Sequence, residues 1–175
     1  MTSRLGLFAL PIIAAVGVAG MPAANADNKR LNESVAANVY TVQHQAGCDT
    51  DIKINPKLRL AAQWHTNDVL HNRALNGDIG SDGSTVADRA RNAGYAGAVA
   101  ETVAINPAMA ISGIELINQW YHRPDYYAIM ADCSNVDIGV WSENLIDRTV
   151  VVAVYGKGDG APPVQSPSRG FGQPS

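Results

Sequence analysis

The sequence predicts an α+β fold in which helices pack in layers against a small sheet. Apolar residues recur at helical spacing from residue 31 onward, with helix start and stop signals between the segments. After Cys133 the pattern changes to alternating and β-branched residues, which are typical of strands. Helical and strand patterns do not alternate regularly along the chain, so we expect α+β layers rather than repeated βαβ units.

Four segments are predicted to be helical. Asn55-Pro56 and Asn106-Pro107 each begin a helix in this prediction, because asparagine can cap a helix and proline suits its first position. Gly94 ends the shortest helix, since glycine readily adopts the left-handed conformation found after a helix. The expected helices cover residues 31–46, 56–76, 84–92 and 107–123.

The C-terminal part of the domain is predicted to form an antiparallel hairpin. Residues 136–141 alternate between apolar and polar or small side chains, and residues 149–155 are mostly β-branched. The polar segment 142–148 between them is expected to form the turn. The second strand carries few polar residues and is therefore expected to be buried.

The first 26 residues have the pattern of a secretory signal peptide. Arg4 supplies a positive charge, residues 5–20 are almost wholly apolar, and residues 24–26 read Ala-Asn-Ala, a small-residue cleavage sequence. The mature chain would then begin at Asp27. A membrane anchor is the less favoured alternative, because Pro11 interrupts the run and a span needs about 20 apolar residues.

The rest of the chain predicts one small domain followed by a tail. Residues 27–157 are long enough for one hydrophobic core, and residues 158–175 are rich in Gly, Pro and Ser and are expected to be disordered. The net charge is −3 and there is no Lys/Arg run, so nucleic-acid binding is not expected. We expect secretion or a place in the cell envelope, with no transmembrane segment after signal cleavage.

The chain contains only two cysteines, Cys48 and Cys133. In an oxidising compartment an even pair predicts a disulfide, here with a single possible pairing. The alternative is two unpaired buried thiols. The spacing excludes a Cys-x-x-Cys metal or redox site.

An ordered series of short segments resembles the CAP superfamily (cysteine-rich secretory proteins, antigen 5 and plant pathogenesis-related 1), specifically its bacterial branch. The series comprises 60–68 (LAAQWHTND), 80–84 (GSDGS), 88–95 (DRARNAGY), 100–104 (AETVA), Trp120 and Arg123-Pro124. The resemblance covers residues 31–157. It implies a three-layer α-β-α sandwich that ends in the antiparallel hairpin.

The resemblance also implies a cleft with two histidines and two acidic residues, which binds a divalent metal in some members. Here Asp78 and Tyr126 stand where the histidines belong, Glu101 matches one acidic position, and Arg123 replaces the other. The predicted tetrad is therefore degenerate. We expect no metal and no cofactor, since neutral imidazole is the usual nitrogen ligand of zinc.

The remaining carboxylates leave several interpretations open. Asp78 and Glu101 could hold a calcium ion through oxygen, or share a proton as an acid–base pair. Alternatively, Glu101 braces the core and Asp78 is an ordinary turn residue. His65 falls on an apolar helix face and is predicted to be a hydrogen-bonded core histidine, whereas His122 could line the cleft or lie on the surface.

The leading hypothesis is a secreted, non-catalytic domain that binds a ligand in its cleft through Tyr126, His122, Glu101 and Asp78. The partner would be a small molecule, a lipid, a glycan or a protein. One alternative is a hydrolase that uses Asp78 and Glu101, although the sequence contains no G-x-S-x-G or H-E-x-x-H motif. Another alternative is a structural envelope protein.

Overall fold

The computed structural model describes residues 23–107 and 111–160 of the chain. The helices in these residues are α1 (Ala23–Gln45), α2 (Pro56–His71), α3 (Val86–Asn92), α4 (Gly113–Tyr121) and α5 (Pro124–Met130). The strands are β1 (Lys53–Ile54), β2 (Val99–Asn106), β3 (Asp137–Leu145) and β4 (Arg148–Gly156).

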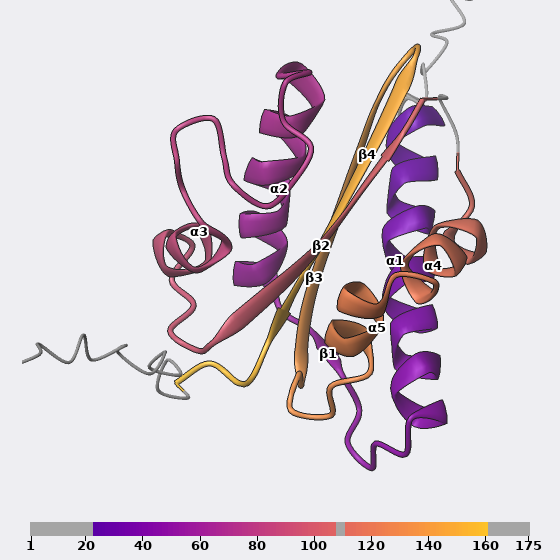
Figure 1. The fold of residues 1–175 in the computed structure, drawn as a ribbon, viewed down its shortest axis with the longest axis vertical. Coiled ribbons are helices and arrows are strands. Elements are labelled where there is room, and N and C mark those ends of the chain that lie inside the picture. Colours follow the sequence, from indigo (N-terminus) through magenta and orange to yellow (C-terminus); the bar gives the residue numbers. More distant parts are fainter. Residues whose placement is uncertain (1–22, 108–110, 161–175) are drawn as a thin grey trace, which may run out of the picture.

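The strands form one sheet in the order β1-β3-β4-β2. β1 runs parallel to β3, whereas β4 pairs antiparallel with both β3 and β2. Helices α2 and α3 lie on one face of this sheet, and α1, α4 and α5 lie on the other (Figure 1). The predicted α-β-α sandwich is confirmed, and so is the antiparallel hairpin of β3 and β4.

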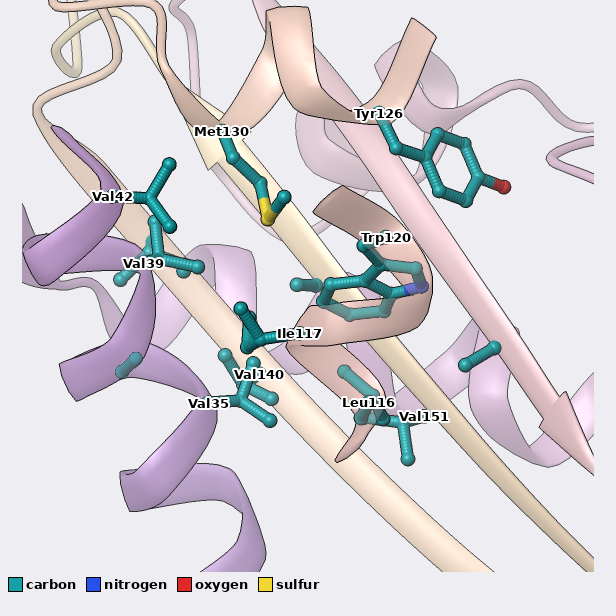
Figure 2. Close-up of a cluster of buried hydrophobic side chains, with 14 of the residues drawn as sticks. Val35, Val39, Val42, Leu116, Ile117, Trp120, Tyr126, Met130, Val140 and Val151 are labelled. Atoms are coloured by element: carbon teal, nitrogen blue, oxygen red, sulfur yellow. The ribbon is translucent and has the colours of Figure 1, made fainter. Parts of the chain in front are cut away.

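The hydrophobic core consists of two clusters, one on each face of the sheet. All nine residues of β4 are buried, because helices cover both of its faces. Val150, Val152 and Val154 pack toward α2. Val151 and Tyr155 pack toward α1, α4 and α5, where Val35, Trp120 and Met130 complete the cluster (Figure 2).

Local capping signals begin two helices at the predicted places, although α2 ends at His71 rather than at the predicted residue 76. The Asn55 side chain accepts a hydrogen bond from the Lys57 amide at 3.0 Å, with Pro56 at the first turn of α2. Thr85 and Asp88 form a reciprocal capping box at the start of α3. In both cases short-range side-chain bonds satisfy helix N–H groups that would otherwise lack partners.

The predicted helix start at Asn106-Pro107 is wrong. Residues 99–106 form β2, which pairs with β4 along its whole length, and α4 begins only at Gly113. The Ser112 hydroxyl caps that helix by accepting the Glu115 amide at 3.1 Å. The long-range pairing with β4 satisfies the backbone of β2, and it outweighs the local helix signal of an Asn-Pro pair.

The prediction that a helix ends at Arg123-Pro124 misses a further helix that begins there. α4 ends at Tyr121, but Pro124 occupies the first turn of a further helix, α5. Proline ends one helix and begins the next here, since its fixed φ angle suits a first helical position. The sequence analysis did not anticipate α5.

The described residues extend past both expected boundaries of the domain. α1 begins at Ala23, so the predicted cleavage sequence at 24–26 lies within it, and the rest of the predicted signal peptide lies outside the described residues. At the other end, Asp159 forms an ion pair with Lys57 and accepts the Ala96 amide at 3.0 Å. Residues 158–160 therefore continue the folded part, and the remaining predicted tail lies outside the described residues.

The predicted disulfide between Cys48 and Cys133 is present, and it joins the loop after α1 to the loop after α5. It links residues 85 positions apart on the same side of the sheet. In the described part of the chain, none of the helices has the length and apolar character required to span a membrane.

Candidate functional site

Three ionisable side chains meet on the face of the sheet that α2 and α3 cover. They are His65 of α2, Arg89 of α3 and Glu101 of β2. Arg89 donates from Nη2 to Glu101 Oε1 at 2.8 Å, and His65 Nε2 lies 3.6 Å from the same oxygen. The Glu101 side chain is only 1% exposed, so this ion pair is sealed from solvent.

Each of the three is positioned by its element. His65 follows the apolar stripe of α2 that contains Leu58, Ala62 and Val69, which turns the imidazole toward the sheet. Glu101 lies on the same side of β2 as Val103, two residues along the strand. In α3, the Asp88 side chain forms part of the capping box, and the next residue, Arg89, is buried.

Arg89 also holds the preceding loop in place. Its Nη1 donates to the Ser84 carbonyl and its Nη2 to the Asp78 carbonyl, both at 2.8 Å. His65 Nε2 contacts the Gly77 carbonyl at 2.9 Å, so loop 77–85 is attached to both helices. The prediction that His65 is a hydrogen-bonded core histidine is confirmed.

Burial dominates the electrostatics of this cluster. It raises the pKa of Glu101 from 4.5 to about 7, against the opposing effect of Arg89, with a smaller upward contribution from Asp78. Burial, followed by the charge of Arg89, lowers the pKa of His65 below 6.5. The imidazole is therefore neutral at pH 7, and its Nε2–H donates to Gly77.

Several polar atoms of the cluster form no hydrogen bond among the described residues. His65 Nδ1, Arg89 Nε and Glu101 Oε2 are buried and have no hydrogen-bond partner among the described residues. Such atoms carry a desolvation cost that the domain must offset elsewhere. The cluster is held by the Arg89–Glu101 pair and by bonds to loop carbonyls, but its hydrogen-bonding network is not fully satisfied.

Asp78 and Glu101 lie on the same face of the sheet but in different environments. The Asp78 residue is exposed, and its backbone carbonyl, not its carboxylate, accepts from Arg89. Glu101 is buried and paired with a cation. Across the residues that the structure describes, no group of three or more His, Cys, Asp or Glu side chains is arranged to hold a metal ion.

Tyr126 and His122 lie on the opposite face of the sheet. Tyr126 is 8% exposed and packs edge-on against Trp120, with ring centres 6.3 Å apart (Figure 2). His122 is exposed at the end of α4, where its Nδ1 donates to the Asn118 carbonyl at 2.7 Å. The four residues predicted to bind ligand are therefore divided between two faces, and their roles in binding stay predictions.

A hollow of about 250 Å³ lies over the buried cluster, where α2, loop 77–85 and α3 meet. Trp64 stands at this hollow with 41% of its surface exposed. Asp68 fixes the loop by accepting both the amide and the hydroxyl of Ser81 at 2.7 Å. The complete lining is Trp64, His65, Asp68, Ser81, Asp82, Ser84, Arg89 and Asn92.

Arg89 and Trp64 are not among the functional candidates predicted from the sequence. A sequence signal for Arg89 does exist. The Thr85-x-x-Asp88 capping box fixes where α3 begins, and Arg89 then lies next to Ala90, which is buried. Trp64 had no comparable signal, because an aromatic residue on an amphipathic helix is most often part of the core.

A scan against protein-family models and a search of curated proteins both found no match. Solved structures do match. An outer surface protein of Borrelia burgdorferi superposes with a TM-score of 0.64 at 15% identity, over 74% of this chain and 94% of that one. An extracellular protein of Bacillus anthracis that contains an SCP domain gives 0.63 at 11% identity, over 75% of this chain and 41% of that one.

A cysteine-rich secretory protein of Staphylococcus aureus is a further match, with a TM-score of 0.54 at 13% identity, over 75% of this chain and 39% of that one. This chain therefore corresponds to less than half of the Bacillus and Staphylococcus chains. Together with the α-β-α layers, these likenesses identify the fold as that of the CAP superfamily. The resemblance predicted from sequence is confirmed at the level of the fold.

Proposed function

We propose that this chain is a secreted CAP-fold domain that binds a glycan, without turnover, in the hollow at Trp64. In this proposal residues 1–26 are removed as a signal peptide and residues 27–157 form the binding domain. The observation that carries it is the contrast between two side chains: Glu101 is sealed against Arg89, whereas Trp64 is exposed at a hollow lined mostly by polar residues.

The burial of Glu101 argues against turnover. A general acid or base must come within hydrogen-bond distance of a substrate atom, and a metal ligand must offer a free lone pair to the ion. The Glu101 side chain is 1% exposed: its Oε1 accepts from Arg89 at 2.8 Å, and its Oε2, which has no partner among the described residues, is buried as well. Substrate would reach it only after the loop held by Arg89 had moved.

The lining of the hollow favours a polyhydroxylated ligand over a lipid. Trp64 offers an apolar ring face, on which the C–H face of a sugar can stack. Asp82 and Asn92 beside it supply hydrogen-bonding groups for hydroxyls. A lipid chain would instead require a continuous apolar wall, which this lining does not provide.

Two of the structural neighbours support an extracellular or surface location for the proposed binding. One is described as an outer surface protein and another as an extracellular protein. The disulfide between Cys48 and Cys133 also fits an oxidising compartment. A glycan of the cell envelope or its surroundings would be accessible there.

Saturation-transfer NMR with a panel of short oligosaccharides tests the proposal. We expect Trp64→Ala to weaken binding of the responding sugar by at least about tenfold, because it removes the stacking surface. Tyr40→Ala is the matched control, since Tyr40 is similarly exposed but lies on α1, across the sheet. Equal binding by the Trp64→Ala variant would exclude the hollow as the glycan site.

One observation favours the hydrolase alternative. The raised pKa of Glu101, about 7, is the kind of value that suits a general acid at neutral pH. If Glu101→Gln abolished hydrolysis of a glycan that the protein binds, while leaving the thermal midpoint at neutral pH unchanged, the enzyme interpretation would replace binding alone.

A further inference from the structure

A second hollow, of about 360 Å³, lies between the end of α2 and the turn that joins β3 to β4. Arg73, Asn76, Ile105 and Arg148 contribute to its lining. It shares no lining residue with the hollow at Trp64, so an inference about it does not depend on the proposed glycan site.

Arg148 is the unusual residue of this second hollow. It is the first residue of β4 and is only 6% exposed. Its Nε atom is buried without a hydrogen-bond partner, and none of the described residues forms an ion pair with it. A cationic side chain that is almost wholly buried and has no counter-charge is costly, so the position favours an anion.

The neighbouring carboxylate does not fill this role. Asp147 accepts from Arg73 Nη2 at 2.7 Å, and both side chains are more than half exposed. Arg73, Arg148 and Asp147 together carry one uncompensated positive charge, in a hollow that Asn76 also lines. Guanidinium groups present several N–H donors in a planar arrangement that matches the oxygens of carboxylates and phosphates.

We propose that Arg148, with Arg73 and Asn76 beside it, binds an oxyanion in this hollow, either a phosphate group or the carboxylate of a small molecule. The anion supplies the counter-charge that Arg148 lacks within the described chain. Arg148 is the primary contact because it is the buried one, whereas Arg73 retains its own partner in Asp147.

Thermal unfolding and NMR of the full chain test this site with sodium phosphate and sodium acetate as probes, against sodium chloride at equal ionic strength. We expect an oxyanion to raise the thermal midpoint by about 4 °C at ten times its dissociation constant, relative to chloride. The Arg148 Nε–H signal should shift in the same titration. A response to phosphate alone would assign a phosphate ligand, and a response to acetate alone a carboxylate.

Variants decide whether Arg148 is responsible. Arg148→Met should weaken the anion response at least tenfold while leaving the anion-free midpoint unchanged or higher, because it removes an unpaired buried charge. Arg91→Met is the matched control, since Arg91 is an exposed arginine on α3, and it should keep the full response.

The proposal is overturned if neither anion acts beyond chloride, or if Arg148→Met responds as strongly as the unaltered protein. If Arg148→Met does not fold, Arg148→Lys replaces it: a weakened response supports the planar guanidinium site, and an undiminished response contradicts it.

Discussion

Glu101 shows how burial and charge pairing compete at a single residue. Its ion pair with Arg89 favours the carboxylate, yet the loss of water around the side chain favours the neutral acid. The raised pKa means that desolvation outweighs the pairing. We therefore regard the pair as a specific link between α3 and β2 rather than as a large net source of stability.

Removing Arg89 alone should be worse than removing both partners. Arg89→Met leaves a buried carboxylate without its cation, and we expect a loss of about 3 kcal/mol or more in unfolding free energy at pH 8. The double variant Arg89→Met, Glu101→Leu should recover much of that loss. Urea unfolding of the single and double variants gives the coupling energy.

The control cycle uses Lys29 and Glu33, an exposed pair at 2.6 Å on α1. It should show a coupling of only about 0.3–0.5 kcal/mol. Additive effects in the Arg89–Glu101 cycle would mean that the two side chains do not depend on each other in the folded protein.

The raised pKa of Glu101 predicts a pH dependence of stability. Between its ordinary value of 4.5 and about 7, the folded protein holds a proton on Glu101 that the unfolded chain releases. The unfolding free energy should therefore rise as the pH falls from 7.5 to 4.5, by roughly 2–3 kcal/mol relative to Glu101→Gln. Urea unfolding of both proteins across this range measures the difference.

His65 acts in the opposite direction but does not obscure the comparison. Its lowered pKa means that the unfolded chain takes up a proton below pH 6.5 before the folded chain does, which reduces stability at low pH. Both proteins retain a buried His65, so the effect of its burial on the pKa, which is the largest one, cancels in the difference. A difference that stays constant with pH would contradict the raised pKa of Glu101.

At the scale of elements, the backbone of α2 lies directly against the sheet at Gly139 of β3. A Cβ atom at this position would lie 2.0 Å from the Arg59 amide nitrogen and 2.1 Å from the Leu58 carbonyl carbon. These are backbone atoms, which cannot move aside as a flexible side chain would. The seating of α2, and with it of His65 and Trp64, therefore depends on glycine here.

Gly139→Ala should destabilise the domain by roughly 2–3 kcal/mol or more, because α2 must shift away from β3. The change is measured as a lower urea midpoint. Gly77→Ala provides the control, since nothing lies within 4 Å of its added methyl group. If both variants unfolded alike, the close packing of α2 on β3 would not be limiting.

The sequence predicted those elements whose signals are local. Asn55 and Thr85 cap their helices through bonds within three residues, and the β-branched run of β4 is a strand signal by itself. β2 was not predicted, because it is stabilised mainly by pairing with β4, which is distant in the sequence, and because the nearby Asn106-Pro107 favours a helix start. A sequence pattern does not report such pairing.

The motif spacing bears only in part on where the candidate residues lie, and their roles stay predictions. Glu101 belongs to the ordered motif series, Asp78 lies just before its segment 80–84, and both lie on one face of the sheet. Tyr126 lies on the opposite face of the sheet, because it packs with Trp120 and Met130 in the hydrophobic cluster that includes α1 residues. Which face a helix covers is decided by packing of the whole molecule, which the spacing of motifs does not reveal.

At the scale of the whole molecule, the disulfide closes a loop that contains most of the fold. Cys48 and Cys133 are 85 residues apart, with α2, β2 and α4 between them. Replacing both by alanine should lower the unfolding free energy by about 4–5 kcal/mol in the chain-entropy account. Urea unfolding of the double variant checks this. An unchanged midpoint would show that removing the disulfide does not raise the conformational entropy of the unfolded chain.

The central claim is that the domain binds its ligand while Glu101 stays sealed, and does not use Glu101 for metal or acid–base chemistry. Native mass spectrometry tests this claim most directly. Protein from a secreting host is measured with and without zinc and calcium, beside Glu101→Gln. We predict a mature chain beginning at Asp27, one disulfide and no stoichiometric metal. A one-to-one metal adduct that disappears in Glu101→Gln would contradict the claim, because it would show that the carboxylate is open to an ion.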